Sequence, residues 1–144
     1  MINSDERFTR WQQVLREHFS YLNNLILTFS IGVLAFLMSL LNDEDFSPNC
    51  CQKIFFSTGV ILSFISIFFG LATSLCRLLD FRTTVRKIKK EINKDNSELA
   101  ELKNLMDIYG KSTWNLFYSQ IASFFLAVIS LTIAFLMIFQ DKLF

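Results

Sequence analysis

Hydrophobic residues gather in three long runs that contain no charged side chain. The runs cover residues 22–41, 54–76 and 117–139, and every Lys, Arg, Asp, Glu and His lies outside them. A helix needs about 20 apolar residues to cross the hydrocarbon core of a bilayer, and each run is at least that long. In a chain of 144 residues, too little polar sequence remains to cover three such runs in a soluble core. The pattern therefore predicts an all-α integral membrane protein with three transmembrane helices.

Residues 1–21 carry apolar side chains at helical spacing, although the segment is polar as a whole. Phe8, Trp11 and Leu15 recur every three or four residues, which predicts an amphipathic N-terminal helix. Trp11, and Trp114 before the third run, are expected to act as interfacial anchors in the headgroup zone. The alternative is that the apolar face of the N-terminal helix packs on other cytosolic helices. Because the run that follows is longer than a signal-peptide core, we expect it to remain as an anchor.

Basic residues are concentrated in two of the four polar segments. Residues 1–21 contain three arginines and residues 77–116 contain nine basic residues, whereas the acidic loop 42–53 and the tail 140–144 contain one lysine each. By the positive-inside rule, we expect the N-terminus and residues 77–116 in the cytoplasm, and the short loop and the C-terminus outside. The bias toward Phe, Ile, Leu, Asn and Lys is typical of an AT-rich bacterial genome, so the expected location is a bacterial inner membrane.

Residues 77–116 keep apolar side chains at a three-four spacing that one long helix would satisfy. A single straight helix would reach about 50 Å from the membrane, and the few residues left would span at most roughly 25 Å on the way back. Turn-forming residues gather at 93–97, where Asp95 and Glu98 resemble a capping box, and Gly110 is expected to end the returning arm. We therefore predict a cytosolic helical hairpin, with a helix lying flat on the membrane surface as the alternative. The expected hairpin core consists of Leu78, Val85, Ile88, Ile92, Leu99, Leu102 and Met106.

The first arm of this hairpin is strongly basic. Each basic residue close to the inner leaflet can gain about 1 kcal/mol from anionic lipid, so anionic phospholipid is an expected partner. The alternative is that these residues only control topology and form a solvated face. Acidic residues follow directly and no recognition motif occurs, so nucleic-acid binding is not expected. The basic residues concerned are Arg77, Arg82, Arg86, Lys87, Lys89 and Lys90.

Each uncharged run also contains small or weakly polar residues at helical spacing. In lipid, such faces are where helix backbones approach closely and hydroxyl groups bond across. Two interpretations are open: the faces pack the three helices into one bundle, or they join several copies of the chain as a homo-oligomer, with or without a narrow pore. Asn23, Asn24 and Gln120 are the most polar residues in the runs, and we expect interhelical hydrogen bonds, interfacial caps or a pore mouth from them. The faces consist of Thr28, Gly32, Ala35 and Ser39 in the first run, Gly59, Ser63, Ser66, Gly70 and Thr73 in the second, and Ser123, Ala127, Ser130 and Ala134 in the third.

The sequence offers no recognisable catalytic or metal site. His18 is the single histidine, and no Cys or carboxylate accompanies it at metal-ligand spacing. No phosphate-binding loop or nucleophile elbow occurs. We therefore expect no enzyme activity, no metal and no cofactor. Cys50 and Cys51 are adjacent, which disfavours a disulfide between them and leaves unpaired loop thiols or an intermolecular bond.

These features favour a non-enzymatic multi-pass membrane protein that self-associates through its small-residue faces. Its architecture alone resembles that of small multi-pass bacterial membrane proteins, including effectors of defence or toxin systems. The first expectation is a regulated pore or membrane-perturbing effector, with the cytosolic helices as a sensing or docking module. The alternative is an accessory or scaffold subunit whose cytosolic helices bind a partner protein. A small transporter ranks third, because no ionisable group lies at mid-membrane.

Overall fold

Three long helices account for nearly all of the chain that the structure describes. The computed structural model describes residues 4–42, 48–93 and 98–140. Its helices are α1 (Ser4–Leu41), α2 (Cys50–Ile92) and α3 (Leu99–Ile138), and no strand occurs within these residues. Each helix is long and apolar enough to cross a membrane. The predicted fold class, an all-α membrane-embedded protein with three membrane-spanning helices, is confirmed.

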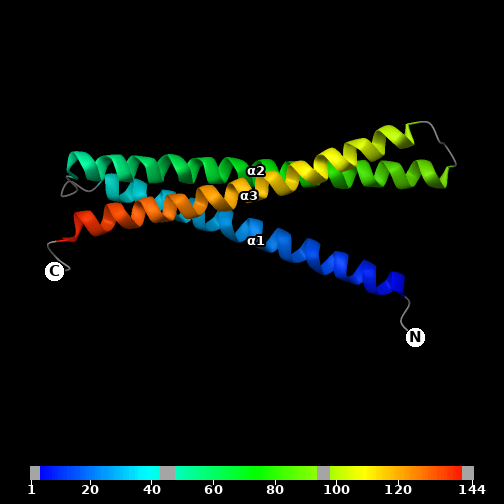
Figure 1. Ribbon diagram of the computed structural model, residues 1–144, viewed down its shortest axis with the longest axis horizontal. Helices are drawn as coiled ribbons and strands as arrows, with labels where there is room; N and C mark the ends of the chain where they lie inside the picture. The colour runs from blue at the N-terminus through cyan, green and yellow to red at the C-terminus, as the bar shows by residue number, and fades with distance from the viewer. Residues whose placement is uncertain (1–3, 43–47, 94–97, 141–144) are drawn as a thin grey trace.

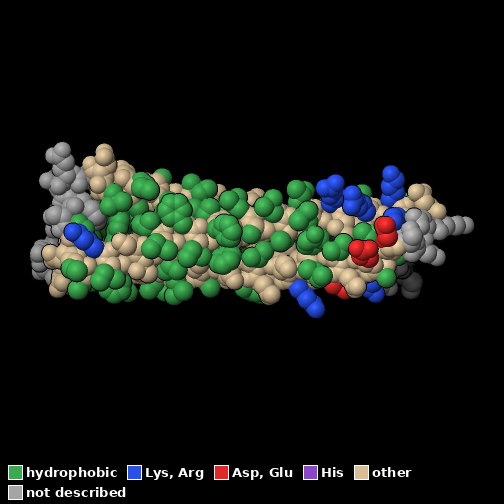
Figure 2. All heavy atoms as spheres, turned by 90° about the horizontal axis from the view of Figure 1, so that it is seen from above, with side chains coloured by type: hydrophobic (Ala, Val, Ile, Leu, Met, Phe, Trp, Pro, Cys, Tyr) green, Lys and Arg blue, Asp and Glu red, His purple; other side chains and the backbone are tan. Residues whose placement is uncertain are grey.

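Each helix continues beyond its uncharged run into polar sequence. α1 is unbroken, so the amphipathic N-terminal segment and the first span form one helix. α2 has 43 residues and α3 has 40. At about 1.5 Å per residue, each is roughly twice as long as the hydrocarbon core is thick. The second half of α2 and the first half of α3 therefore form two antiparallel arms that extend past the spans (Figure 1). Figure 2 shows the hydrophobic side chains along most of the molecule and most of the charged ones gathered at the hairpin end.

Two details at the ends of the hairpin differ from the expectation. α3 runs through Gly110 without a break. A glycine inside a helix costs only about 1 kcal/mol relative to alanine, and the packing of α3 along α2 offsets this cost. Asp95 of the expected capping box lies outside the described residues. Glu98 stands at the N-cap of α3 with φ 66° and forms no side-chain capping bond.

α2 and α3 pack together along the small residues of their uncharged runs. Because these residues recur at alternating steps of four and three, they form one face of a helix that winds around its neighbour. A Cβ atom at Gly59 would lie 2.5 Å from Leu131 Cγ, so the side chain of Leu131 packs directly on the glycine and leaves no room for a larger residue. Ser130 Oγ donates a hydrogen bond to the carbonyl oxygen of Phe55 at 2.8 Å, which joins the helices directly. The residues buried in this contact include Gly59, Ser63, Ser66, Gly70 and Thr73 of α2 and Ser123, Ala127, Ser130 and Ala134 of α3.

α1 packs on this pair, mainly on α2, through a different face from the expected one. A step of two residues turns a helix by about 200°, so Ser30 lies opposite Thr28. Ser30 is fully buried, and its hydroxyl lies 3.4 Å from that of Ser66. The sequence interpretation that the small residues of the first run pack α1 into the bundle is corrected, because that face points outward. The exposed residues are Thr28, Gly32, Ala35 and Ser39, whereas the buried ones include Phe19, Asn23, Ser30, Leu34 and Leu37.

The apolar stripe of the first hairpin arm also faces outward. Because α2 is a single helix, the face that it turns inward in the membrane span continues into the arm with a seven-residue repeat. This face contains Thr73, which is buried, and Asp80 and Lys87, which are half-buried. Polar residues of α2 therefore face the returning arm, and the expected hairpin core is corrected on the α2 side. The exposed fractions are 64% for Leu78, 50% for Val85, 49% for Ile88 and 74% for Ile92. On the returning arm, Leu102 is buried, and Leu99 and Met106 are half-buried.

Candidate functional site

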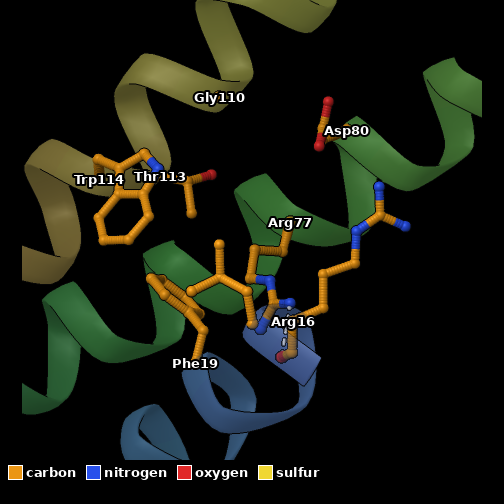
Figure 3. Close-up of a pocket in the computed structure, with 8 residues that line it drawn as sticks. Arg16, Phe19, Arg77, Asp80, Gly110, Thr113 and Trp114 are labelled. Atoms are coloured by element: carbon orange, nitrogen blue, oxygen red, sulfur yellow. Dashed lines mark hydrogen bonds between the residues drawn. The ribbon is translucent and has the colours of Figure 1, made fainter. Parts of the chain in front are cut away.

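A pocket lies where the three helices leave their uncharged runs on the hairpin side. Its volume is about 170 Å³. Arg77 directly follows the second run, and Phe19 and Trp114 each lie one helical turn before the first and third runs. Figure 3 shows the rings of Phe19 and Trp114 on one side of the pocket and the side chains of Arg16, Arg77 and Asp80 on the other. The lining residues are Leu15, Arg16 and Phe19 from α1, Arg77 and Asp80 from α2, and Gly110, Thr113 and Trp114 from α3.

Arg77 is held in place by two contacts with α1. Its Nη2 donates a hydrogen bond to the backbone carbonyl oxygen of Arg16 at 3.2 Å. Its guanidinium carbon lies 4.6 Å from the centre of the Phe19 ring, within cation–π range. Burial lowers the pKa of Arg77, the charge of Arg16 lowers it further, and Asp80 raises it. Arginine remains protonated in proteins because its ordinary pKa is so high, so Arg77 is a fixed cation.

The charges around the pocket do not cancel. Arg16 and Arg77 each carry a positive charge, and Asp80 is the one carboxylate among the lining residues. Within the described part of the chain, neither arginine lies within ion-pair distance of a carboxylate. Two guanidinium groups from different helices therefore share one pocket with a single acidic group nearby.

An aromatic cluster forms the opposite wall. The ring of Phe19 lies 5.2 Å from that of Trp114 in an edge-on arrangement and 4.3 Å from that of Phe117. Trp114 thus stands at the end of its run, where an interfacial tryptophan is favoured, and it also connects α3 to α1. Trp11, the other expected anchor, is 73% exposed on the part of α1 that diverges from the hairpin (Figure 1).

The other basic residues of the first arm do not reach this pocket. Lys87 pairs with Glu91 at 3.6 Å on the same helix, and Lys90 pairs with Glu98 across the hairpin. Of the six residues expected to contact lipid headgroups, Arg77 alone lines the pocket. Arg82, Arg86 and Lys89 are exposed.

A second polar feature lies between the spans. Asn23 Nδ2 donates a hydrogen bond to Ser74 Oγ at 2.9 Å, and Ser66 Oγ donates one to the carbonyl oxygen of Gln120 at 3.2 Å. Gln120 is completely buried, yet neither atom of its amide has a hydrogen-bond partner among the described residues. Asn23 and Gln120 thus lie inside the bundle, and Asn23 forms the interhelical bond expected of it.

The outer face of α1 is the third feature. A Cβ atom at Gly32 would meet nothing within 4 Å. Next to it lies a shallow depression of about 250 Å³, lined in part by Tyr21, Asn24 and Thr28. Asn24 is exposed, and within the described chain its side-chain amide forms no hydrogen bond. This face therefore combines small residues with an unpaired amide inside an uncharged run.

Sequence reasoning named Arg77 and Trp114 but missed the other members of the pocket. Arg16, Phe19 and Gly110 are ordinary in their local sequence, and only the packing of three distant segments brings them together. The usable signal was their position, since each lies within two turns of the end of an uncharged run. No group of three possible metal ligands occurs within residues 4–42, 48–93 and 98–140. Cys50, Cys51 and Cys76 are unpaired thiols.

No family model matches the chain, and no curated protein or solved structure shows significant similarity to it.

Proposed function

We propose that this is a non-enzymatic membrane protein that self-associates through the outer face of α1. The observation that carries the proposal is the outward stripe of Thr28, Gly32, Ala35 and Ser39. The corresponding residues of α2 and α3 are already buried within the chain. In lipid, a stripe of small residues favours close backbone approach to another helix. A second copy supplies the same stripe, so the contact is self-complementary.

Asn24 supports a second copy as the occupant of this face. Asn24 lies in the first turn of its uncharged run, at the edge of the hydrocarbon core, and a neighbouring helix that offers a hydrogen-bonding group would satisfy its unpaired amide. Thr28 Oγ1 donates to the carbonyl oxygen of Asn24 at 2.9 Å, so this hydroxyl is satisfied within α1. Across a symmetric contact, the Asn24 amides of two copies can bond to each other.

Within this framework we place the protein in a bacterial inner membrane, with the N-terminus and the hairpin in the cytoplasm. The distribution of basic residues supports the orientation, and the composition bias toward Phe, Ile, Leu, Asn and Lys supports the bacterial location. As its activity we propose a regulated pore or membrane-perturbing assembly. Because the small faces of α2 and α3 are buried against each other, any pore in the assembly would be lined by exposed residues of α1 that flank the stripe.

A scaffold or accessory subunit is the second candidate, and the exposed stripe of the first arm favours it. Leu78, Val85 and Ile92 are at least half exposed on an arm that extends beyond the spans. A helix of a partner protein could bury this stripe by the usual three-four pattern of anchors. Dissipation of the membrane potential by the purified chain separates the two candidates, as described below.

Replacing Gly32 by leucine is expected to weaken self-association by about tenfold or more, because overpacking a close contact costs about 1–3 kcal/mol. The fold of the single chain should not change, because the new side chain meets open space. The measurement is molar mass by light scattering in mild detergent across a concentration series. Ala122→Leu, which introduces the same side chain at an exposed position of α3, is the matched control. A monomeric wild-type chain, or an unchanged oligomer in G32L, would refute the α1 interface.

If the assembly conducts, the wild-type chain in liposomes should dissipate an imposed potassium diffusion potential, and G32L should not. In a variant with all cysteines replaced, Leu25→Cys should then be blocked by a charged thiol reagent, since Leu25 is an exposed position of α1 that flanks the stripe. Phe125→Cys, on an exposed position of α3, is the matched control and should not be blocked. An oligomer that leaves the potential intact would favour the scaffold.

A further inference from the structure

We propose that the pocket between the three helices binds the phosphate group of an anionic phospholipid, which Arg16 and Arg77 hold at the membrane surface on the hairpin side. The proposal does not depend on self-association, because every lining residue belongs to one chain.

The position of the pocket favours a lipid headgroup. Arg77 and Trp114 flank the ends of two uncharged runs, so the pocket lies at the depth where headgroups meet the helices. Basic pockets between membrane-spanning helices are known sites for acidic headgroups. On the proposed topology, this is the cytoplasmic leaflet, in which anionic lipids face the hairpin.

Arg77 is held in a fixed orientation at the pocket and keeps N–H groups available for a phosphate. The orientation of Arg77 is fixed by the hydrogen bond from Nη2 to the Arg16 carbonyl oxygen and by the ring of Phe19. Its remaining N–H groups have no hydrogen-bond partner among the described residues. A planar guanidinium group can donate two parallel hydrogen bonds to two oxygens of one phosphate. Such charge-assisted bonds are stronger than bonds to neutral acceptors. A phosphate between Arg16 and Arg77 would relieve the repulsion that two nearby cations impose on each other.

The other wall distinguishes a lipid from a free anion. Leu15, Phe19 and Trp114 are apolar, and Gly110 leaves open space beside them, because a Cβ atom there would meet nothing within 4 Å. A phospholipid can place its phosphate on the arginines and its glycerol and upper acyl chain against this wall. Inorganic phosphate would use only the charged side.

The test is lipid titration of the detergent-solubilised full-length chain by native mass spectrometry, with phosphatidylglycerol and phosphatidylcholine as probes. We expect one molecule of phosphatidylglycerol to bind each chain tightly, and phosphatidylcholine to bind with clearly lower affinity. Arg16→Gln, Arg77→Gln and Gly110→Leu should each weaken it by about tenfold or more, the last by filling the pocket without a clash. Arg82→Gln removes an exposed arginine of α2 outside the pocket and should leave the affinity unchanged.

Three results would overturn the proposal. Equal affinity for the two lipids would show that the phosphate charge is not recognised. An equal loss in R82Q and R77Q would show diffuse attraction to the basic arm rather than a pocket. Displacement of phosphatidylglycerol by millimolar inorganic phosphate, with phosphate itself bound, would assign the pocket to a free anion. G110L keeps the proposal testable even if R77Q folds poorly, because it retains both arginines.

Discussion

Replacing Gly70 by leucine is expected to separate the helices within the chain. A Cβ atom at Gly70 would stand 2.6 Å from Gln120 Nε2 and 2.7 Å from Leu27 Cδ2, so the new side chain would collide with α3 and α1 together. Gln120 is completely buried and has little room to move aside. Overpacking typically costs about 1–3 kcal/mol, and a collision with two helices lies at the upper end of this range.

The stability of the bundle can be followed through Trp114 in a Trp11→Phe background, because the chain contains two tryptophans. Trp114 contacts Phe19 of α1, so its emission reports whether α1 remains in place. We expect the native Trp114 emission of G70L to be lost at a markedly lower fraction of denaturing detergent than that of the parent chain. G32L is the matched control, because the same substitution there meets open space. If the two variants denature alike, the close approach at Gly70 is not what holds the bundle together.

The number and place of the membrane-spanning segments could be predicted because hydrocarbon imposes a simple rule. Uncharged runs of sufficient length must be helical in a membrane, since every backbone polar group has to be satisfied internally. The hairpin followed from distance alone, because a single straight helix could not return to the membrane within the residues available. Neither inference needed any knowledge of which side chains touch.

The direction that each face points could not be predicted in the same way. Small residues mark a place where a helix can be approached closely, but they do not say by what. In α2 and α3 the neighbour is the other helix of the hairpin, whereas in α1 the inward face is set by Ser30, Leu34 and Leu37. The apolar stripe of the first arm was also assigned to the wrong side, because it was predicted to face the returning arm and instead faces outward. Leu78 and Ile88 appeared to need a partner, yet the continuous winding of α2 turns Asp80 and Lys87 toward α3.

The pocket was the feature that the sequence predicted least. Its residues come from segments around positions 15–19, 77–80 and 110–114, and no spacing within one segment signals a site. A pair of arginines at the ends of two uncharged runs is equally expected from topology control alone. Their shared role depends on the crossing of α1 over α2, which places the carbonyl oxygen of Arg16 within reach of Arg77.

Replacing Phe19 by alanine is expected to release the N-terminal half of α1 from the hairpin. Phe19 is 8% exposed, and its ring contacts Trp114, Phe117 and the guanidinium of Arg77. Truncation of a buried phenylalanine costs about 3 kcal/mol or more, to which the lost aromatic and cation–π contacts contribute. Because α1 makes few other contacts with α3, little remains to hold the two helices together at this end.

The expected result of F19A, in the Trp11→Phe background, is a red shift of Trp114 emission in the native state, because Trp114, which is 42% exposed in the intact chain, loses the cover of Phe19 and becomes more exposed to water or headgroups. Lipid binding by the pocket should fall with it, since Arg77 loses the ring that orients it. Phe29→Ala is the matched control: Phe29 lies on the same helix but is 56% exposed, so its truncation removes lipid contact rather than packing. An F19A chain whose emission matches that of F29A would mean that Phe19 does not hold α1 at this end, and that the hydrogen bonds of Asn23 to Ser74 and of Arg77 to the Arg16 carbonyl oxygen suffice.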